Sequence, residues 1–190
     1  DKNLYALDKK TGKEVWKWHE GKPGRFYSAA AVWPVAANGK VFIADPERAL
    51  TAIDASTGKT VWRTKESMVR ETVSLSEDKR RIYSKTMNDS VVCYSATTDF
   101  PEKIWASNVG FGYEHAPSMP VEKEGVVFGS TKNGLMFGLD AHTGKVLWKH
   151  KVGNSLISTL VPLSKNKCLF TATGGEIGLL VIDYKTNKHK

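Results

Sequence analysis

A short sequence pattern that returns several times along the chain constrains the fold more than any other feature. The pattern occupies residues 4–16, returns at 50–62 and again at 136–148, and a degraded copy lies at 92–105. Each copy ends in a tryptophan, and successive tryptophans are about 43 to 46 residues apart. A repeat of this length that is built from short strands is typical of a propeller blade.

Each period contains four strand-like runs separated by turn-forming residues. Between Trp16 and Trp62 the runs are 31–36, 40–44, 50–54 and 60–64. The separators are rich in Asn, Asp, Pro and Gly, which favour turns, and no window shows the period of an amphipathic helix. The sequence therefore predicts an all-β chain, a β-propeller whose blades are four-stranded antiparallel sheets.

The Asp, Thr and Gly residues of the three intact copies predict a tight hairpin, whereas the degraded copy has Ser95 in place of the Asp and a longer turn. Asp and Thr side chains bond backbone N–H groups in such turns, and Gly adopts positive φ at little steric cost. The Trp four residues after the Gly stands on the outermost strand, where we expect its indole to pack across the junction with the neighbouring blade. We assign these positions to a structural motif rather than to catalysis: Asp8, Gly12, Trp16, Asp54, Gly58, Trp62, Trp105, Asp140, Gly144, Trp148 and Asp183.

The repeats divide the chain into the blades of a single partial propeller. Residues 1–18 end one blade, residues 19–64, 65–106 and 107–150 form complete blades, and residues 151–190 form an incomplete blade of three strands. This strand count does not close into a ring, so we expect about four blades' worth of a larger propeller. The exposed edges of such an arc favour edge-mediated dimerisation.

The repeated pattern resembles the tryptophan-docking motif of the pyrroloquinoline-quinone-like β-propeller superfamily. Members of that superfamily include quinoprotein alcohol dehydrogenases, outer-membrane assembly lipoproteins of the BamB type, and sensor domains attached to kinases or hydrolases. The chain is closest in character to the non-catalytic BamB-type propellers. The resemblance implies a periplasmic or cell-surface location, although the chain itself contains no signal peptide.

The connections between blades are the candidate binding surface, because loops held by a rigid scaffold carry function more often than its strands. They follow the tryptophans at similar distances, so we expect them to converge at the mouth of the central channel. The candidate ligand- or partner-binding residues in them are Arg25, Tyr27, Arg70, Glu71, Tyr113, Glu114 and His115. The alternative is that Arg70 and Glu71 pair with channel neighbours and that the aromatic residues cap the core.

The charge of the chain does not indicate a nucleic-acid-binding protein. The formal net charge is +8, but few of the basic residues are arginines and the lysines recur singly at turns. Solvated lysines at turns are the ordinary explanation for such a distribution. We also expect no membrane span, because no stretch approaches the length of apolar sequence that one requires.

Catalytic and cofactor signatures are absent from the sequence. His115 has no nucleophile or acid at motif spacing, and the GxSxG, HExxH and Walker patterns do not occur. We expect no metal site, because the acidic runs near Asp45 and Asp89 read as turns. The resemblance implies that a quinone-binding relative would have adjacent cysteines and a calcium site, whereas Cys93 and Cys168 stand far apart. No cofactor is therefore expected, and pyrroloquinoline quinone with calcium belongs to the alternative function alone.

The sequence favours a non-enzymatic propeller that serves as a scaffold, a ligand sensor or a protein-interaction module. Its partner would be a protein or a glycan bound at the loop face. One alternative is a fragment of a quinone-dependent dehydrogenase. Another is an accessory domain of a larger kinase or hydrolase.

Overall fold

The computed structural model describes residues 3–19, 32–110, 118–131, 133–153, 157–185 and 188–189. All regular secondary structure in these ranges is β-strand, which confirms the predicted all-β class. Within the same ranges, no helix has the length and apolar character needed to cross a bilayer.

The strands form one hairpin and a series of four-stranded antiparallel sheets, each in simple sequence order. The N-terminal hairpin consists of β1 (Leu4–Leu7) and β2 (Glu14–Trp18). Blade 1 consists of β3 (Val35–Ala37), β4 (Lys40–Ala44), β5 (Leu50–Asp54) and β6 (Thr60–Thr64). Blade 2 consists of β7 (Val69–Leu75), β8 (Arg81–Thr86), β9 (Ser90–Ser95) and β10 (Lys103–Asn108).

The remaining strands form two further sheets of the same kind. Blade 3 consists of β11 (Val121–Lys123), β12 (Val126–Ser130), β13 (Leu135–Asp140) and β14 (Val146–Lys151). Blade 4 consists of β15 (Val161–Ser164), β16 (Lys167–Thr171), β17 (Ile177–Asp183) and β18 (Lys188–His189).

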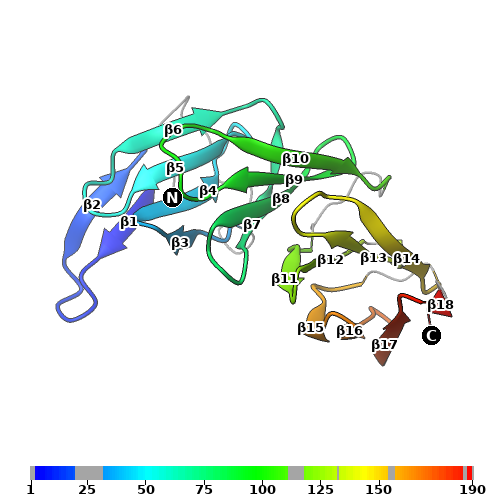
Figure 1. Ribbon diagram of the computed structural model, residues 1–190. Coiled ribbons are helices and arrows are strands. Elements are labelled where there is room, and N and C mark those ends of the chain that lie inside the picture. Colours follow the sequence, from blue (N-terminus) through cyan, green and yellow to red (C-terminus); the bar gives the residue numbers. More distant parts are fainter. Residues whose placement is uncertain are drawn as a thin grey trace.

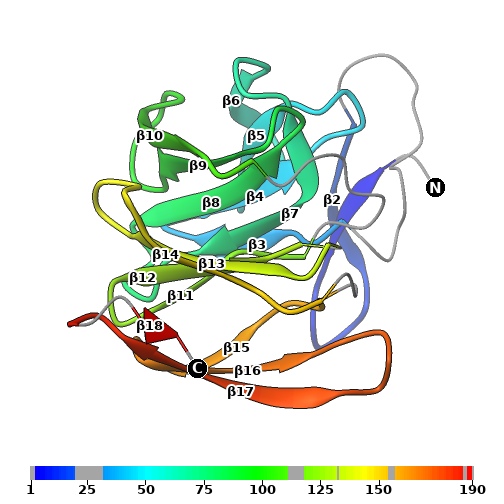
Figure 2. The same cartoon turned by 90° about the vertical axis from the view of Figure 1, so that its right-hand side faces the viewer.

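The first strands of successive blades lie next to one another. Strand β3 contacts β7, β7 contacts β11, and β11 contacts β15. The blades therefore fan out from a common inner line, and together they follow an open arc (Figures 1 and 2). This arrangement is a partial β-propeller, as the repeat predicts.

Two strand predictions differ from the structure. The run predicted at 31–36 begins its ladder only at Val35, because Pro34 has no N–H to donate; Trp33 instead forms an isolated parallel bridge with Thr72 of blade 2. The last sheet has a short fourth strand that was not expected, because the chain turns after Asp183 and pairs Lys188 with that residue.

The hydrophobic core lies between the blades rather than within any one of them. Trp16 and Trp18 of the hairpin pack on Ile43 and Ile53 of blade 1. Further clusters fill the junctions between blades 1 and 2, 2 and 3, and 3 and 4. Each blade is thus apolar on both faces, and its stability depends on its neighbours.

A bulge accompanies each tryptophan of the motif. The residue just before the Trp is the extra residue of the bulge and has no partner in the strand register. The Trp itself pairs with a small residue on the third strand of its blade: Ala6, Ala52, Cys93 or Gly138. A Cβ at Gly138 would stand 2.1 Å from Nε1 of Trp148. The small residue therefore gives the indole room to lie across its own sheet and reach the next one.

Candidate functional site

The first motif tryptophan joins the hairpin to blade 1. Nε1 of Trp16 donates a hydrogen bond of 2.9 Å to the carbonyl oxygen of Ala55 in the β5–β6 turn. The indole lies directly against Gly58, where a Cβ would be 2.8 Å from the ring carbons. Gly58 also has a φ of +71°, so the turn needs glycine for its conformation and for its contact.

The same contact recurs at later junctions. Trp105 donates a 3.0 Å hydrogen bond to the carbonyl of Ala141 and lies against Gly144, where a Cβ would be 2.6 Å from the ring. In the longer turn of blade 2, Trp62 reaches the carbonyl of Thr98 instead, at 3.3 Å. These motif residues hold blades together.

Asp54 holds the turn that receives Trp16. Its Oδ1 accepts hydrogen bonds from the Ser56 hydroxyl at 2.6 Å, the Thr57 amide at 2.8 Å and the Thr57 hydroxyl at 2.9 Å. These hydrogen bonds lower the pKa of Asp54 to about 2, and the bond from the Ser56 hydroxyl has the largest effect. Asp8 and Asp140 accept equivalent bonds from Thr11 and Thr143.

Among the candidate binding residues, the structure places Arg70 and Glu71 at the start of β7, the innermost strand of blade 2. Glu71 pairs with Arg48 of blade 1 at 2.9 Å and with Arg70 at 3.2 Å, and both partners of the second pair are buried. Burial alone would raise the pKa of Glu71, but a backbone hydrogen bond and the two arginines outweigh it, so the pKa is lowered.

This pairing corresponds to the alternative given for Arg70 and Glu71, namely ion pairing with channel neighbours. The other candidates, Arg25, Tyr27, Tyr113, Glu114 and His115, lie outside the described residues. A ligand-binding role for any of the seven stays a prediction.

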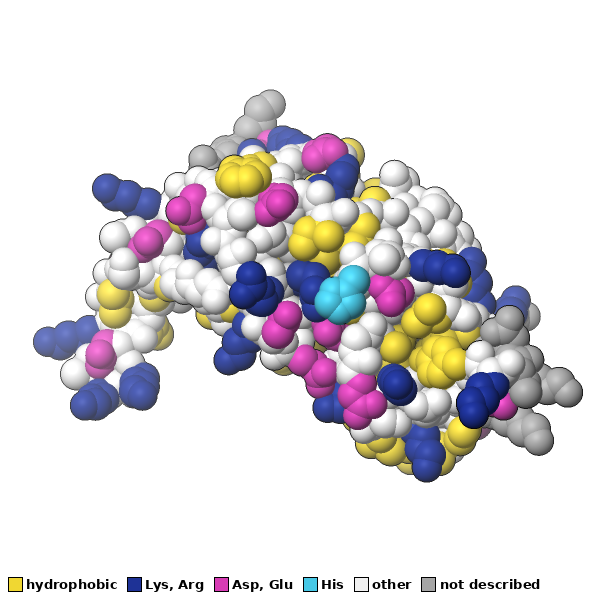
Figure 3. All heavy atoms as spheres, in the orientation of Figure 1, with side chains coloured by type: hydrophobic (Ala, Val, Ile, Leu, Met, Phe, Trp, Pro, Cys, Tyr) yellow, Lys and Arg dark blue, Asp and Glu magenta, His cyan; other side chains and the backbone are white. Residues whose placement is uncertain are grey.

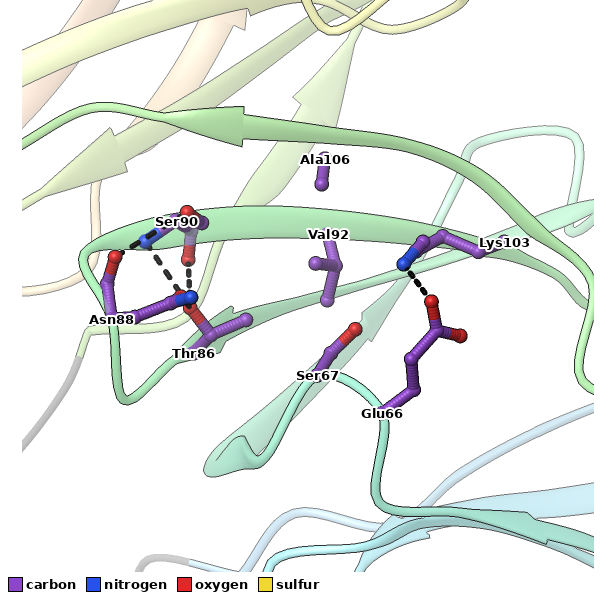
Figure 4. Close-up of a pocket in the computed structure, with 8 residues that line it drawn as sticks. All are labelled: Glu66, Ser67, Thr86, Asn88, Ser90, Val92, Lys103 and Ala106. Carbon is purple, nitrogen blue, oxygen red and sulfur yellow. Dashed lines mark hydrogen bonds and ion pairs between the residues drawn. The ribbon is translucent and has the colours of Figure 1, made fainter.

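The structure also contains a small cavity that the sequence did not predict, at the junction of blades 1 and 2. It encloses about 110 Å³ and is lined by Glu66, Ser67, Thr86, Asn88, Ser90, Val92, Lys103 and Ala106 (Figure 4). Glu66 and Ser67 come from the β6–β7 connection, whereas Thr86, Asn88 and Ser90 surround the β8–β9 turn. The β6–β7 connection and the β8–β9 turn lie at the same end of the blades. We call the surface at this end of the blades the connection face.

The polar groups of the cavity are held in fixed positions. The Thr86 hydroxyl donates to Oδ1 of Asn88 at 2.5 Å and accepts from the amide of Ser90 at 3.2 Å. At the opposite wall, Lys103 forms an ion pair with Glu66, which raises the pKa of the lysine (Figure 4). The cavity is therefore preformed and polar, with two apolar residues at its back.

A second cavity occupies the equivalent place one blade further along. It encloses about 160 Å³ at the junction of blades 2 and 3, and its lining consists of Gly110, Thr131, Asn133, Leu135 and Lys151. Thr131 and Asn133, at the β12–β13 turn, occupy the positions that Thr86 and Asn88 occupy at the β8–β9 turn. The connection face thus carries a repeated hollow at successive junctions.

Lys85 is a fully buried charged residue within a cluster of polar groups. Its Nζ donates to the carbonyl oxygen of Ser130 at 2.5 Å and to the hydroxyl of Ser118 at 3.1 Å, across the junction of blades 2 and 3. The Ser118 hydroxyl is itself committed as a donor to the Ser130 carbonyl at 2.6 Å. The serine and lysine therefore do not form an activated nucleophile, and the cluster ties two blades together.

Comparison with known families agrees with this geometry. A family model described as outer membrane protein assembly factor BamB matches residues 1–99 and again residues 88–189. The chain belongs to this family. A search of the curated proteins finds no significant match.

Solved structures share the fold of this chain at low sequence identity. BamB from Moraxella catarrhalis matches with a TM-score of 0.74 and 16% identity, over 95% of this chain and 55% of that one. The computationally designed Ika8 protein matches with a TM-score of 0.74 and 16% identity, over 96% of this chain and 53% of that one. The designed Ika4 protein has a TM-score of 0.65 and 15% identity, over 84% of this chain and 96% of that one. This chain thus spans about half the length of the first two structures, and the likeness at this identity shows the fold alone.

The two cysteines of this BamB-family chain do not fit the quinone site that the wider resemblance implies. Cys93 lies in β9 and Cys168 in β16, and both are buried free thiols. Burial raises the pKa of both, that of Cys168 to about 11. In the part of the chain that the structure describes, no three His, Cys, Asp or Glu side chains gather as a metal site.

Proposed function

We propose that this chain is a non-enzymatic propeller that binds another protein through its connection face. The fold and the BamB family support a protein-interaction scaffold. The observation that carries the choice of face is the preformed polar cavity between blades 1 and 2, which is built from a connection and a turn of different blades. A rigid scaffold that presents loops at one end is the usual architecture of such a binding surface.

Several observations support a scaffold rather than an enzyme. The buried Ser118–Lys85 contact is structural, and the motif Asp and Trp residues form turns and blade junctions. On the side of the molecule shown in Figure 3, lysines and arginines are spread out rather than gathered in one patch, which favours a protein partner over a nucleic acid. The family supports a periplasmic or cell-surface location for the protein.

Site-specific photo-crosslinking tests the proposed face. A photoreactive phenylalanine analogue replaces Met87, which is exposed in the β8–β9 turn beside the cavity. The control carries the same analogue at Ser56, which is exposed in the β5–β6 turn at the other end of blade 1. We expect cells that express the chain to yield crosslinked protein at position 87 and none at position 56. Equal crosslinking at both positions, or none at either, would contradict the proposal.

A titration with pyrroloquinoline quinone and calcium tests the dehydrogenase alternative. The readout is quenching of the motif tryptophans, with free tryptophan as the control for absorption by the quinone. We expect the protein and the control to respond alike. Saturable quenching at micromolar quinone would favour the dehydrogenase instead.

A further inference from the structure

The turn of the N-terminal hairpin has the same backbone as the two turns that receive an indole within this chain. In the hairpin, the amide of Gly12 donates to the carbonyl of Asp8 and the amide of Asp8 donates to the carbonyl of Lys13, both at 2.8 Å. The turns that receive Trp16 and Trp105 have the same two bonds, at 2.8 or 2.9 Å. The glycines of the three turns also share a φ of +71° or +72°. The hairpin turn therefore has the conformation of an indole-binding turn.

The carboxylate that supports this turn is also the same. Oδ1 of Asp8 accepts hydrogen bonds from the Lys10 amide at 3.0 Å, the Thr11 amide at 2.8 Å and the Thr11 hydroxyl at 2.9 Å. Asp54 and Asp140 accept the corresponding bonds in the two turns that hold an indole. The hairpin turn is therefore preformed, and an incoming indole does not have to pay for ordering it.

The hairpin turn offers an acceptor for an indole N–H. In the occupied turns the acceptor is the carbonyl oxygen of the residue that follows the Asp, which is Ala55 in one turn and Ala141 in the other. The residue at this position of the hairpin is Lys9. In the described ranges no donor is bonded to its carbonyl oxygen. Because the three turns share one backbone conformation, this oxygen occupies the position of the oxygen that Trp16 reaches in blade 1.

The space that an indole fills at the other two turns is open at the hairpin, which forms one end of the arc (Figure 1). No described atom lies within 4 Å of the Cβ position of Gly12. Leu7 is 59% exposed. Ile53 and Leu139 have the same register position in their blades and are fully buried in the clusters that contain the docked indoles. Tyr5, on the same face of β1 as Leu7, is also exposed. The hairpin therefore presents an apolar floor that no described residue covers.

Lysines beside this floor indicate the charge of its occupant. Lys9 and Lys10 are exposed, and neither forms an ion pair with a described carboxylate. The corresponding residues of the occupied turn in blade 1 are Ala55 and Ser56, which carry no charge. Charge complementarity selects partners and orients them as they approach. The hairpin therefore favours a tryptophan that has acidic residues beside it.

A second copy of this chain has no suitable tryptophan to offer. Its motif tryptophans are buried in its own blade junctions: Trp16, Trp62, Trp105 and Trp148. Trp33 is 58% exposed, but its backbone is bridged to Thr72 of an inner strand and does not belong to an outer one. These observations favour a tryptophan of another protein as the occupant.

We propose that the outer face of the N-terminal hairpin binds a tryptophan, flanked by acidic residues, on a β-strand of a partner protein. The indole lies on Leu7 and against Gly12, and its N–H donates to the carbonyl oxygen of Lys9. The acidic residues of the partner face Lys9 and Lys10. The hairpin turn corresponds to the β5–β6 turn, at the opposite end of the blades from the connection face. This site is therefore separate from the surface of the proposed function.

Titration of the full chain with a short capped peptide, followed by amide NMR shifts, tests the chemistry of the site. The peptide has one tryptophan between two glutamates. We expect saturable shifts at Leu7, Lys10 and Gly12 in the millimolar range. Replacing the tryptophan of the peptide by alanine should abolish these shifts, and replacing its glutamates by lysines should weaken binding at least threefold. Linear, non-saturating shifts with the tryptophan peptide would overturn the inference.

Substitution of the turn glycine tests the close approach of the indole. Gly12→Ala places a methyl group where the ring should lie, and we expect it to weaken peptide binding at least tenfold. Gly125→Ala is the matched control, because Gly125 has a φ of +77° and no described atom within 4 Å of its Cβ position, but stands in the β11–β12 turn of blade 3. It should bind as the unmodified chain does. Equal binding by the two variants would contradict the site.

A second variant keeps the test decisive if Gly12→Ala does not fold. Leu7→Thr removes part of the apolar floor at an exposed position and should weaken peptide binding at least threefold. Leu163→Thr makes the same change at an exposed position of blade 4 and should have no effect. Unchanged binding by Leu7→Thr would overturn the inference.

Photo-crosslinking identifies the source of the tryptophan. With the photoreactive analogue in place of Lys13, we expect crosslinks to a different protein that are lost in Gly12→Ala and retained in Gly125→Ala. Crosslinks between copies of this chain alone, or none, would overturn the assignment to a partner protein. Crosslinks at position 87 should be the same in Gly12→Ala and in the unmodified chain. The hairpin site and the connection face can therefore fail independently of one another.

Discussion

The indole of Trp16 lies against Gly58 of the next sheet so closely that a Cβ at position 58 would stand 2.8 Å from the ring. Trp105 has the same relationship to Gly144 one junction further on. Gly12 occupies the equivalent turn position in the hairpin with the same positive φ, but no described atom lies within 4 Å of its Cβ position. The chain thus contains the same turn with and without a docked indole.

Substitution of these glycines separates the cost of the contact from the cost of the turn. Gly58→Ala places a methyl group in a left-handed conformation and against the indole, and we expect it to lower the free energy of unfolding by about 2–4 kcal/mol. Gly12→Ala meets only the conformational cost, about 1 kcal/mol. Urea denaturation of both variants measures the difference. Equal losses would show that the indole contact contributes little.

The acidity of Asp54 depends on the hydroxyl of Ser56. Asp8 has Lys10 at the corresponding place, and its pKa is lowered by Thr11 and the Lys10 amide only. We expect Ser56→Ala to raise the pKa of Asp54 from about 2 toward its usual value of 3.8, as measured by carboxyl NMR titration. The titration of Asp8 in the same variant serves as the internal control. An unchanged value for Asp54 would contradict the prediction.

The sign of the pH effect follows from the lowered pKa. The pKa of Asp54 is lower in the folded state than in the unfolded state, so ionised Asp54 stabilises the fold above about pH 4. This stabilisation is lost as the pH falls toward 2. Ser56→Ala should therefore reduce the acid sensitivity of folding between these values.

The buried ion pairs of Glu71 should matter far more than the exposed pair of Glu66. Glu71→Gln leaves Arg48 and Arg70 without this carboxylate in a buried setting, and we expect a loss of about 3–5 kcal/mol in unfolding free energy. Glu66→Gln disrupts a pair with Lys103 at the surface and should cost less than about 1 kcal/mol. Urea denaturation of both variants measures this contrast, and equal costs would contradict it.

The outer face of blade 4 should cause the isolated chain to associate. Hydrophobic side chains gather toward the end of the arc that carries blades 3 and 4 (Figure 3). The exposed apolar residues of β15 and β17 are Val161, Leu163, Ile177, Leu179 and Val181. Exposed apolar surface of this kind favours self-association. We expect sedimentation velocity to show concentration-dependent dimers.

Substitution of this face tests the association. Leu179→Lys combined with Val181→Lys should shift the chain to monomer, whereas Val15→Lys, at an exposed apolar site in the hairpin, should not. Dimers that survive the double substitution would show that the contact lies elsewhere.

The repeat in the sequence was sufficient to predict the propeller and most of its strands. The runs at 40–44, 50–54 and 60–64 are strands β4, β5 and β6 with the same bounds. The hydrogen bonds that form a turn are local. Asp54, Ser56 and Thr57 bond to one another within one loop, so the turn can be predicted from consecutive residues of the sequence. The unexpected strand β18 is a pairing that depends on where the chain returns after a turn.

The cavity could not be recognised in advance, although one signal was present. Ala106 stands where the other copies of the motif have Lys17, Arg63 and Lys149, a departure that is visible in the sequence. Only the structure shows that this alanine lines a cavity together with Glu66 of the β6–β7 connection and Asn88 of the β8–β9 turn.

The sequence by itself determined the fold of this chain, because a propeller blade is specified by turns and alternating strands that form from neighbouring residues. Only the tertiary structure decided which polar groups face one another. Glu71 pairs with Arg48 of another blade as well as with its neighbour Arg70, and Ala106 leaves a hollow beside a loop about 40 residues away in sequence. Contacts of that kind depend on how neighbouring blades pack, and no local pattern encodes them.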